Sequence, residues 1–192
     1  MDIGKPLIDW GKYDVEPLRR VILDQEPAAW NESNQRQDDY EVHKQTESIV
    51  MLFASLTWPE VEVTRESGWT RLHEEAKPLM DKIIAEHYTP GGVILRAVAA
   101  KLKAGKSITP HFDSLPSFKY GHRIHVPITT NRNVRFMIDG RPYRFELDHV
   151  YEINNRKVHS VVNAGKEDRI TFIFDYVPAD AIREQNVVIS NG

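Results

Sequence analysis

From Val93 to Val177 the chain is a succession of short extended runs separated by turn residues, and this pattern limits the possible folds more than any other feature. The runs read VILRAVAAKL, GHRIHVPITT, VRFMIDG, RPYRFEL, HVYEIN, VHSVVN and RITFIFDYV. They are rich in β-branched and aromatic residues, which favour strands. Asp139 and Gly140, between two runs, predict a tight hairpin turn. Many short strands with closely spaced turns are typical of a sandwich or barrel, so we expect a jelly-roll core over residues 91–178.

The first ninety residues predict a different layer. The segment DVEPLRRVILDQ has Asp14 as a candidate N-cap before an apolar stripe, which predicts a short helix. TRLHEEAKPLMDKIIAEHY has apolar residues at helical spacing and predicts a long helix that Pro78 bends or breaks. SIVMLFASL predicts a buried strand. We therefore expect one mainly β (α+β) domain over residues 1–192, with a mixed, largely helical N-terminal layer (1–90) on a jelly roll (91–178) and a C-terminal tail (179–192).

Composition narrows the function classes. The chain is 41% hydrophobic and 28% charged, as folded domains usually are, and its net charge is −3, so nothing predicts a nucleic-acid partner. It has no cysteine, which excludes thiol nucleophiles and thiolate metal sites. MDIGKPLIDWGKYD does not resemble a signal peptide, and no apolar run approaches the ~20 residues of a membrane span. We expect a cytoplasmic protein with no membrane partner.

Three residues form a candidate metal site. His111 and Asp113 in SITPHFDSL are two apart on an extended segment and therefore share a side. His159 begins a later run. Two imidazoles and one carboxylate bind one face of a six-coordinate ferrous ion and leave three positions open, two for a 2-oxo acid and one for dioxygen. The alternative is that the three residues only make hydrogen bonds at strand ends.

Three cationic or polar residues accompany this group. Arg169 opens a strongly apolar run, and its planar guanidinium suits the far carboxylate of a 2-oxo acid. It could instead form a surface ion pair with Asp168 or Glu167. Arg123 and His125 share one face of GHRIHVPI. Arg123 either contacts the co-substrate or substrate, or pairs with an acidic neighbour.

Other polar residues remain open. Arg96 shares a face with apolar residues of its run, so it either meets a substrate carboxylate inside the barrel or lies at the wet end of the strand. Asn154 and Asn155 either hold substrate or make a turn, which adjacent asparagines commonly do. His43 and Gln45 are weaker candidates for the substrate pocket.

The segments KLKAGKSITPHFD, HRIHVPITTN and YEINNRKVHSVVNAGKEDRITFIFDYV resemble the aspartyl/asparaginyl β-hydroxylase family of non-haem Fe(II), 2-oxoglutarate-dependent oxygenases. The resemblance covers about residues 93–177 and implies a double-stranded β-helix that uses Fe(II), 2-oxoglutarate and O2. By position it implies that the catalytic iron ligands are His111, Asp113 and His159, and that 2-oxoglutarate is bound by Arg169 and His125, with Arg123 on the same strand face. Animal members have glycine where this chain has Asp113, so the sequence looks more like the bacterial branch that retains the carboxylate.

The resemblance implies a dioxygenase that hydroxylates an unactivated C–H bond and releases succinate and CO2. The expected substrate is a small molecule such as a free amino acid, or a peptide side chain. Two alternatives stay open. One is a non-catalytic jelly-roll binding module, and the other is a cupin-like metal enzyme that does not use 2-oxoglutarate. Arg169 distinguishes the second, because a cupin has no need of a buried arginine for a diacid.

Overall fold

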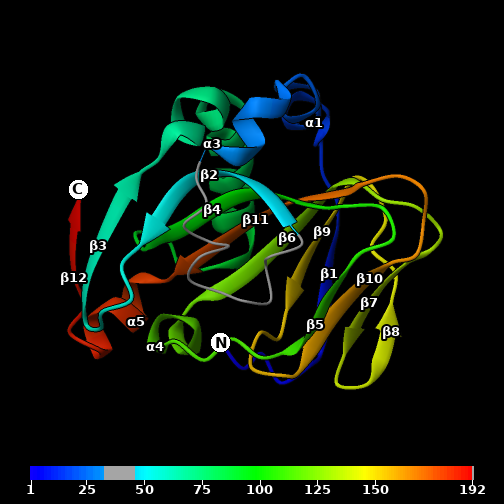
Figure 1. Ribbon diagram of the computed structural model, residues 1–192. Coiled ribbons are helices and arrows are strands. Elements are labelled where there is room, and N and C mark those ends of the chain that lie inside the picture. The colour runs from blue at the N-terminus through cyan, green and yellow to red at the C-terminus, as the bar shows by residue number, and fades with distance from the viewer. Residues whose placement is uncertain (33–45, 192) are drawn as a thin grey trace.

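The computed structural model describes residues 1–32 and 46–191, and the described strands form two sheets (Figure 1). The larger sheet has the order β1-β9-β6-β11-β4-β2-β3-β12 and the smaller the order β5-β10-β7-β8. The strands of the larger sheet are β1 (Leu7–Lys12), β9 (His149–Ile153), β6 (His122–Thr129), β11 (Arg169–Val177), β4 (Val93–Leu102), β2 (Thr46–Ala54), β3 (Glu60–Arg65) and β12 (Val188–Asn191). Those of the smaller sheet are β5 (Ser107–His111), β10 (His159–Asn163), β7 (Val134–Ile138) and β8 (Arg141–Tyr143).

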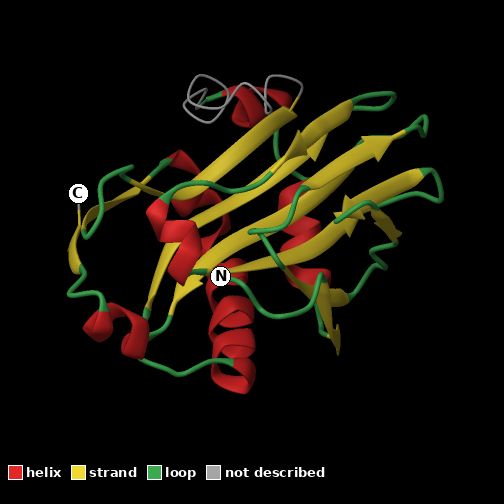
Figure 2. Ribbon diagram, turned by 90° about the horizontal axis from the view of Figure 1, so that it is seen from below, coloured by secondary structure: helices red, strands yellow, loops and turns green. Residues whose placement is uncertain are grey.

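Residues from both sheets line one cavity between them. Among the described strands every pairing is antiparallel except that of β12 with β3. Figure 2 shows the strands running side by side across the molecule. This arrangement confirms the predicted double-stranded β-helix, and the hairpin turn at Asp139 and Gly140 joins β7 to β8 with both residues at positive φ.

The helices lie outside the two sheets. They are α1 (Glu16–Leu23), η1 (Pro27–Asn31), α3 (Ser67–His87), α4 (Pro116–Tyr120) and α5 (Ala179–Glu184). In Figure 1, α1 and α3 lie together at the top of the view, against the larger sheet, whereas α4 and α5 lie near its lower end. The long helices therefore cover one face of the larger sheet and leave its other face to the cavity.

Strand alternation explains how the larger sheet supplies both the packed core and a wall of the cavity. On β11, Phe172 and Phe174 point outward and pack with Ile83 of α3 in the main buried cluster. Arg169 and Ile173, on the same strand with opposite parity, line the cavity between the sheets. Successive side chains of a strand point to opposite faces, so a single run supplies both the core and the wall of the cavity.

Both predicted helices are confirmed, with two differences in detail. The N-cap of α1 is Val15 rather than Asp14, although the Asp14 carboxylate accepts a hydrogen bond from the backbone N–H of Glu16 at 3.3 Å. Pro78 lies inside α3 without ending it, and the helix runs on to His87. A proline removes one backbone hydrogen bond, and burial of the apolar face of α3 against the sheet offsets that loss.

Three strands were not predicted. The N-terminal residues supply β1 and β3 as well as the predicted β2, and the C-terminal residues supply β12. A bulge at Gly11, whose φ is 86°, interrupts the alternation of β1. β12 has a single neighbour, β3, at the edge of the sheet. Pairing with a strand distant in sequence holds each of these two segments in place, β1 against β9 and β12 against β3.

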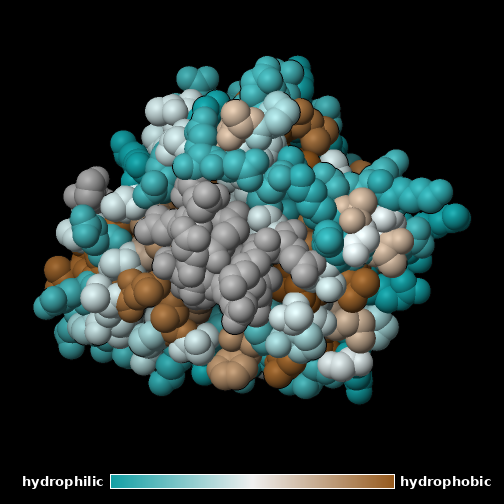
Figure 3. Space-filling view, in the orientation of Figure 1, coloured by the Kyte–Doolittle hydropathy of each residue, from teal (hydrophilic) through white to brown (hydrophobic). Residues whose placement is uncertain are grey.

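On the coloured part of the face shown in Figure 3, hydrophilic and intermediate residues predominate, and hydrophobic residues form small separate groups. Within the described residues, no helix combines the length and apolar character that crossing a membrane requires.

Candidate metal centre

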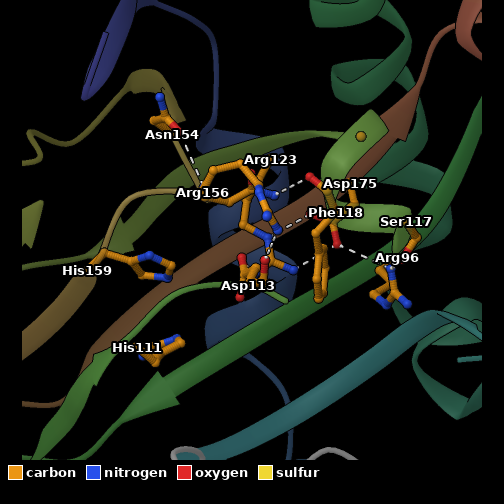
Figure 4. Close-up of polar contacts among 12 residues, drawn as sticks. Arg96, His111, Asp113, Ser117, Phe118, Arg123, Asn154, Arg156, His159 and Asp175 are labelled. Carbon is orange, nitrogen blue, oxygen red and sulfur yellow. Dashed lines mark hydrogen bonds and ion pairs between the residues drawn. The ribbon is translucent and has the colours of Figure 1, made fainter. Parts of the chain in front are cut away.

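The three candidate metal ligands lie close together, and His111 and His159 line the cavity between the sheets (Figure 4). His111 is the last residue of β5, His159 is the first of β10, and the two are direct partners in the antiparallel pairing of these strands. Their ring centroids are 4.4 Å apart. One ligand atom from each of His111, Asp113 and His159 lies within 4.8 Å of the other two. The prediction that these side chains converge is therefore met by the geometry.

Hydrogen bonds orient both imidazoles. Nδ1 of His111 lies 2.8 Å from the carbonyl oxygen of Thr109, and Nδ1 of His159 lies 3.0 Å from that of Lys157. Because a carbonyl only accepts, each Nδ1 donates, and in the neutral ring the lone pair is then on Nε2. Burial lowers the pKa of His159, which favours the neutral ring that a metal needs. The donor set of two imidazole nitrogens and one carboxylate oxygen therefore fits Fe(II).

Asp113 is held through its backbone and its side chain. Its backbone N–H donates to the carbonyl of Asn155 at 3.0 Å, and its carbonyl accepts from Nη1 of Arg156 at 2.7 Å. Its Oδ2 accepts from Nη1 of Arg123 at 2.6 Å. The residue is only 8% exposed. These contacts fix the carboxylate although Asp113 lies beyond the end of β5.

Arg123 is bound at the same time by a second carboxylate. Its Nε donates to Oδ1 of Asp175 at 2.7 Å and its Nη2 to Oδ2 at 2.8 Å. Burial raises the pKa of Asp175, but the charge and hydrogen bonds of Arg123 and the charge of Arg96 together lower it by more. The pKa therefore lies below its ordinary value. Arg123 thus pairs with acidic side chains, which was one of the two interpretations of the sequence. Its contact with a co-substrate stays a prediction.

Arg169 and His125 lie in the cavity. The cavity has about 480 Å³ of empty space, which includes solvent on its open side, and its walls include His111, His159, Arg123, His125 and Arg169. The Arg169 guanidinium carbon lies 5.8 Å from the centre of the Phe136 ring, and the His159 ring centre lies 6.2 Å from the same ring. Arg169 is 5% exposed, so it is not a surface residue. Asp168, its partner in the alternative interpretation, accepts the backbone N–H of Ala104 at 2.8 Å.

Arg96 also lies inside the barrel, so the interpretation that placed it at the wet end of its strand is wrong. It is 8% exposed, and its Nη1 donates to Oγ of Ser117 at 3.1 Å. The same nitrogen lies 3.9 Å from Oδ2 of Asp175. The Phe118 ring lies between two cations in Figure 4, with its centre 4.6 Å from the Arg96 guanidinium and 4.4 Å from that of Arg123.

The paired asparagines make a turn. The backbone N–H of Arg156 donates to Oδ1 of Asn154 at 3.2 Å, and Nδ2 of Asn155 donates to the carbonyl of Phe118 at 3.2 Å. His43 and Gln45 lie outside the described residues.

Sequence reasoning missed Asp175, Ser117, Phe118 and Arg156. A signal for Asp175 was present, because it is the one charged residue between Arg169 and Val177 in a strongly apolar run. A charged side chain in a buried strand needs a partner, and that requirement points to a cation on a neighbouring strand.

The fold and the His–Asp–His group define a double-stranded β-helix protein with a candidate metal centre. The sequence model of the aspartyl/asparaginyl β-hydroxylase family matches residues 18–178, and the chain belongs to this family. It is therefore an enzyme, a 2-oxoglutarate-dependent oxygenase, and not a non-catalytic binding module. No curated protein matches the sequence significantly.

Solved structures agree with the fold. A 2OG-Fe(II) oxygenase family oxidoreductase from Burkholderia pseudomallei superposes with a TM-score of 0.62 at 12% identity, over 90% of this chain and 84% of that one. The nickel complex of the non-heme monooxygenase ThoJ gives 0.55 at 11%, over 90% and 74%. The viral collagen prolyl hydroxylase of Paramecium Bursaria Chlorella virus-1, in its 2OG complex, gives 0.53 at 8%, over 93% and 99%. At these identities the likeness concerns the fold.

Proposed function

We propose that this protein is an Fe(II)- and 2-oxoglutarate-dependent hydroxylase that acts on a C–H bond of a small molecule such as a free amino acid, or of a peptide side chain. The observation that carries the proposal is the convergence of His111, Asp113 and His159, two of which line a cavity whose wall also contains Arg169. Succinate and CO2 are the expected co-products. The metal and the co-substrate together supply the oxidising chemistry when bound.

The residues of the chain bind and orient these groups. His111 and His159 offer Nε2, since their Nδ1 atoms are bonded to backbone carbonyls, and Asp113 offers a carboxylate oxygen. A facial set of three ligands leaves the remaining positions for the co-substrate and oxygen. Arg169 is the binder of the far carboxylate of 2-oxoglutarate, because it lies in the cavity wall and its planar fork matches a carboxylate.

The apolar walls exclude water from this end of the cavity. Phe136 and Ile173 line it beside Arg169, and His125 packs edge-on against Phe136 with ring centres 5.5 Å apart. His125 is 4% exposed and lies on the Arg123 face of β6, which supports its assignment to the co-substrate site. A low-dielectric wall strengthens the attraction between Arg169 and a diacid.

Two residues beside the proposed ligands are candidates for contact with the substrate. Phe112, between two proposed ligands, is 51% exposed, and the guanidinium of Arg156 lies 5.9 Å from the centre of its ring. An exposed aromatic ring and a cation beside a metal centre suit the apolar part and the carboxylate of an amino acid or peptide.

The test is succinate release from 2-oxoglutarate with ferrous iron, ascorbate and a library of free amino acids, other small metabolites and peptides. We expect at least one amino acid or peptide to stimulate succinate formation and to gain one oxygen atom by mass spectrometry. An enzyme that oxidises a substrate at an unchanged rate without 2-oxoglutarate would instead be the cupin-like alternative.

A further inference from the structure

We propose that Asp175 is a positioning residue for the metal centre, and that it acts through Arg123 on the carboxylate of Asp113. This inference rests on the proposed function, since it concerns the ligand Asp113. It assigns a role to a buried acidic side chain that does not itself line the cavity and that reaches the proposed ligand Asp113 through Arg123.

Hydrogen bonds link Asp175 to Arg123, and Arg123 to Asp113. Both oxygens of Asp175 accept from Arg123, through Nε at 2.7 Å and Nη2 at 2.8 Å. This two-point contact fixes the plane of the guanidinium, and its Nη1 then reaches Oδ2 of Asp113 at 2.6 Å. A bond to Oδ2 leaves Oδ1 as the oxygen available to a cation. The orientation of Asp113 thus depends on the orientation of Arg123, which Asp175 sets.

The sheet places Asp175 for this purpose. Asp175 and Arg123 are direct partners in the pairing of β11 with β6, and Asp175 is 2% exposed. On the other side of β11, Arg96 of β4 is also a direct partner of Asp175. The Phe118 ring lies close to both guanidinium groups. Arg123 is therefore bounded by Asp175 in the sheet and by Phe118 from α4, and its side chain has little freedom to turn away from Asp113 (Figure 4).

Asp175 also offsets the positive charge of Arg123 beside the proposed metal centre. A guanidinium bonded to a ligand carboxylate repels a divalent cation and withdraws charge from the ligand. Asp175 carries the opposite charge at hydrogen-bond distance from Arg123, so the pair is close to neutral as seen from the centre. Removing the charge of Asp175 leaves that of Arg123 uncompensated. Both the orientation and the charge argument predict weaker metal binding.

A purely structural role for the Asp175–Arg123 pair makes a different prediction. In that case the loss of Asp175 lowers the stability of the fold, and the folded fraction binds metal normally. A role of Arg123 in holding 2-oxoglutarate predicts a higher KM for that co-substrate with unchanged affinity for metal. Metal affinity measured without 2-oxoglutarate separates both cases from ours.

The experiment titrates metal-free protein with Co²⁺ alone and follows the visible absorption of the bound ion, which also reports its ligand set. We expect Asp175→Asn to bind Co²⁺ about 10–100-fold more weakly than the wild type, the usual effect of losing a group that orients a ligand. Thermal melting of each metal-free protein, by circular dichroism, measures the folded fraction during the titration.

Glu152→Gln is the matched control. Glu152 is also 2% exposed and bonded, to Tyr88 at 2.9 Å and to His122 at 2.5 Å, but its partners His122 and Tyr88 belong to the outer side of the sheet. We expect this variant to keep wild-type Co²⁺ affinity. Equal losses in both variants, or wild-type affinity in folded Asp175→Asn, would overturn the inference.

Arg123→Lys decides the question if Asp175→Asn does not fold. Lysine keeps the cation between the two carboxylates but lacks the fork that binds both. We expect at least about 10-fold weaker Co²⁺ binding from the loss of orientation, and wild-type affinity would overturn the inference. His111→Ala tests the proposed function separately. If the wild type binds Co²⁺ and His111→Ala does not, the metal centre stands whatever Asp175→Asn shows, and a wild type that binds no Co²⁺ removes both proposals.

Discussion

The two faces of the larger sheet differ in chemistry although they are equally buried. On β11, the outward Phe172 and Phe174 are fully buried against the helical layer. The inward Arg169, Thr171 and Asp175 are 5%, 0% and 2% exposed. Burial therefore does not distinguish the core from the site in this protein. What distinguishes them is whether a buried side chain needs a specific partner.

This difference predicts how each face responds to substitution. An outward residue contributes through packing, so its loss leaves a cavity and lowers the free energy of unfolding. An inward polar residue such as Arg123 contributes through bonds to particular groups, Asp113 and Asp175. Its loss changes the position and charge of those groups. Outward substitutions should change stability first, and inward ones should change binding first.

The largest effect is expected for the ligands themselves. His111→Ala removes one of three proposed metal ligands, and we expect turnover coupled to 2-oxoglutarate to fall below detection. The melting temperature should change little, because His111 lies at the end of a strand and is partly exposed. Succinate assays and circular dichroism measure the two quantities. His149→Ala, at another strand end where His149 contacts Asp9, is the control that should keep activity. Coupled turnover in His111→Ala contradicts the ligand assignment.

On the outward face, Phe172→Ala should have the largest effect on stability. Phe172 is fully buried in the main cluster, and a Phe→Ala change in a core costs about 3–5 kcal/mol. We expect the activity per folded molecule to stay near that of the wild type at a temperature well below melting. Urea denaturation measures the loss. Leu56→Ala, at a residue that is 50% exposed, should change stability by less than about 0.5 kcal/mol. A site-specific loss of activity in Phe172→Ala would erase the distinction between the faces.

The strands of the jelly roll could be predicted from sequence because each carries its own local signal. Residues 169–177 are mostly apolar and rich in β-branched and aromatic side chains. The Asp-Gly pair at 139–140 is typical of the tight turn that it forms, in which both residues have positive φ. β1 and β12 have weaker signals, and the alternation of valine with polar residues in β3, EVEVTR, was a signal that the sequence reasoning missed. β1 and β12 are strands because a neighbour distant in sequence pairs with them, and that information lies in the assembled sheet, whereas β3 pairs with β2 just before it in the chain and also with the distant β12.

The site was predictable to the same extent. Alternation along single strands placed Arg123 with His125, and the cavity contains both. The partners of Arg123 could not be predicted, since they depend on the register of β6 against β11 and on the loop that carries Asp113. Arg96 was misplaced for the same reason, because the carboxylate that lies near it, Asp175, is on the neighbouring strand.

A smaller effect is expected where binding alone changes. Arg169→Lys keeps the charge at the start of β11 but cannot form two parallel bonds to a carboxylate. A hydrogen bond to a charged group contributes about 1.5–3 kcal/mol, so we expect the KM for 2-oxoglutarate to rise roughly tenfold to a hundredfold. Co²⁺ affinity should stay unchanged, because the side chain of Asp113 is oriented by Arg123 and, through Arg123, by Asp175. An unchanged KM would remove Arg169 from the co-substrate site.

The smallest effect is expected for Thr171, an inward residue of β11 that is assigned neither to the metal centre nor to the 2-oxoglutarate site. Within the described part of the chain, Oγ1 of Thr171 is buried and has no hydrogen-bond partner. Valine has the same shape without the hydroxyl, so Thr171→Val should raise the free energy of unfolding by about 1 kcal/mol, or about 2–4 °C in melting temperature. Thr129→Val is the contrast, because its hydroxyl accepts from the N–H of Ile170 at 2.8 Å and donates to the carbonyl of Asp168 at 2.9 Å.

Thr129→Val should therefore destabilise the protein by about 1–3 kcal/mol, the cost of leaving a buried group without its partner. The two threonines differ in whether their hydroxyls are bonded, so opposite signs would show that bonding, and not inward orientation, decides the cost. If Thr171→Val keeps wild-type stability and raises the KM for 2-oxoglutarate, its hydroxyl belongs to the co-substrate site, and the functional part of the inward face then runs without interruption from Arg169 to Ile173.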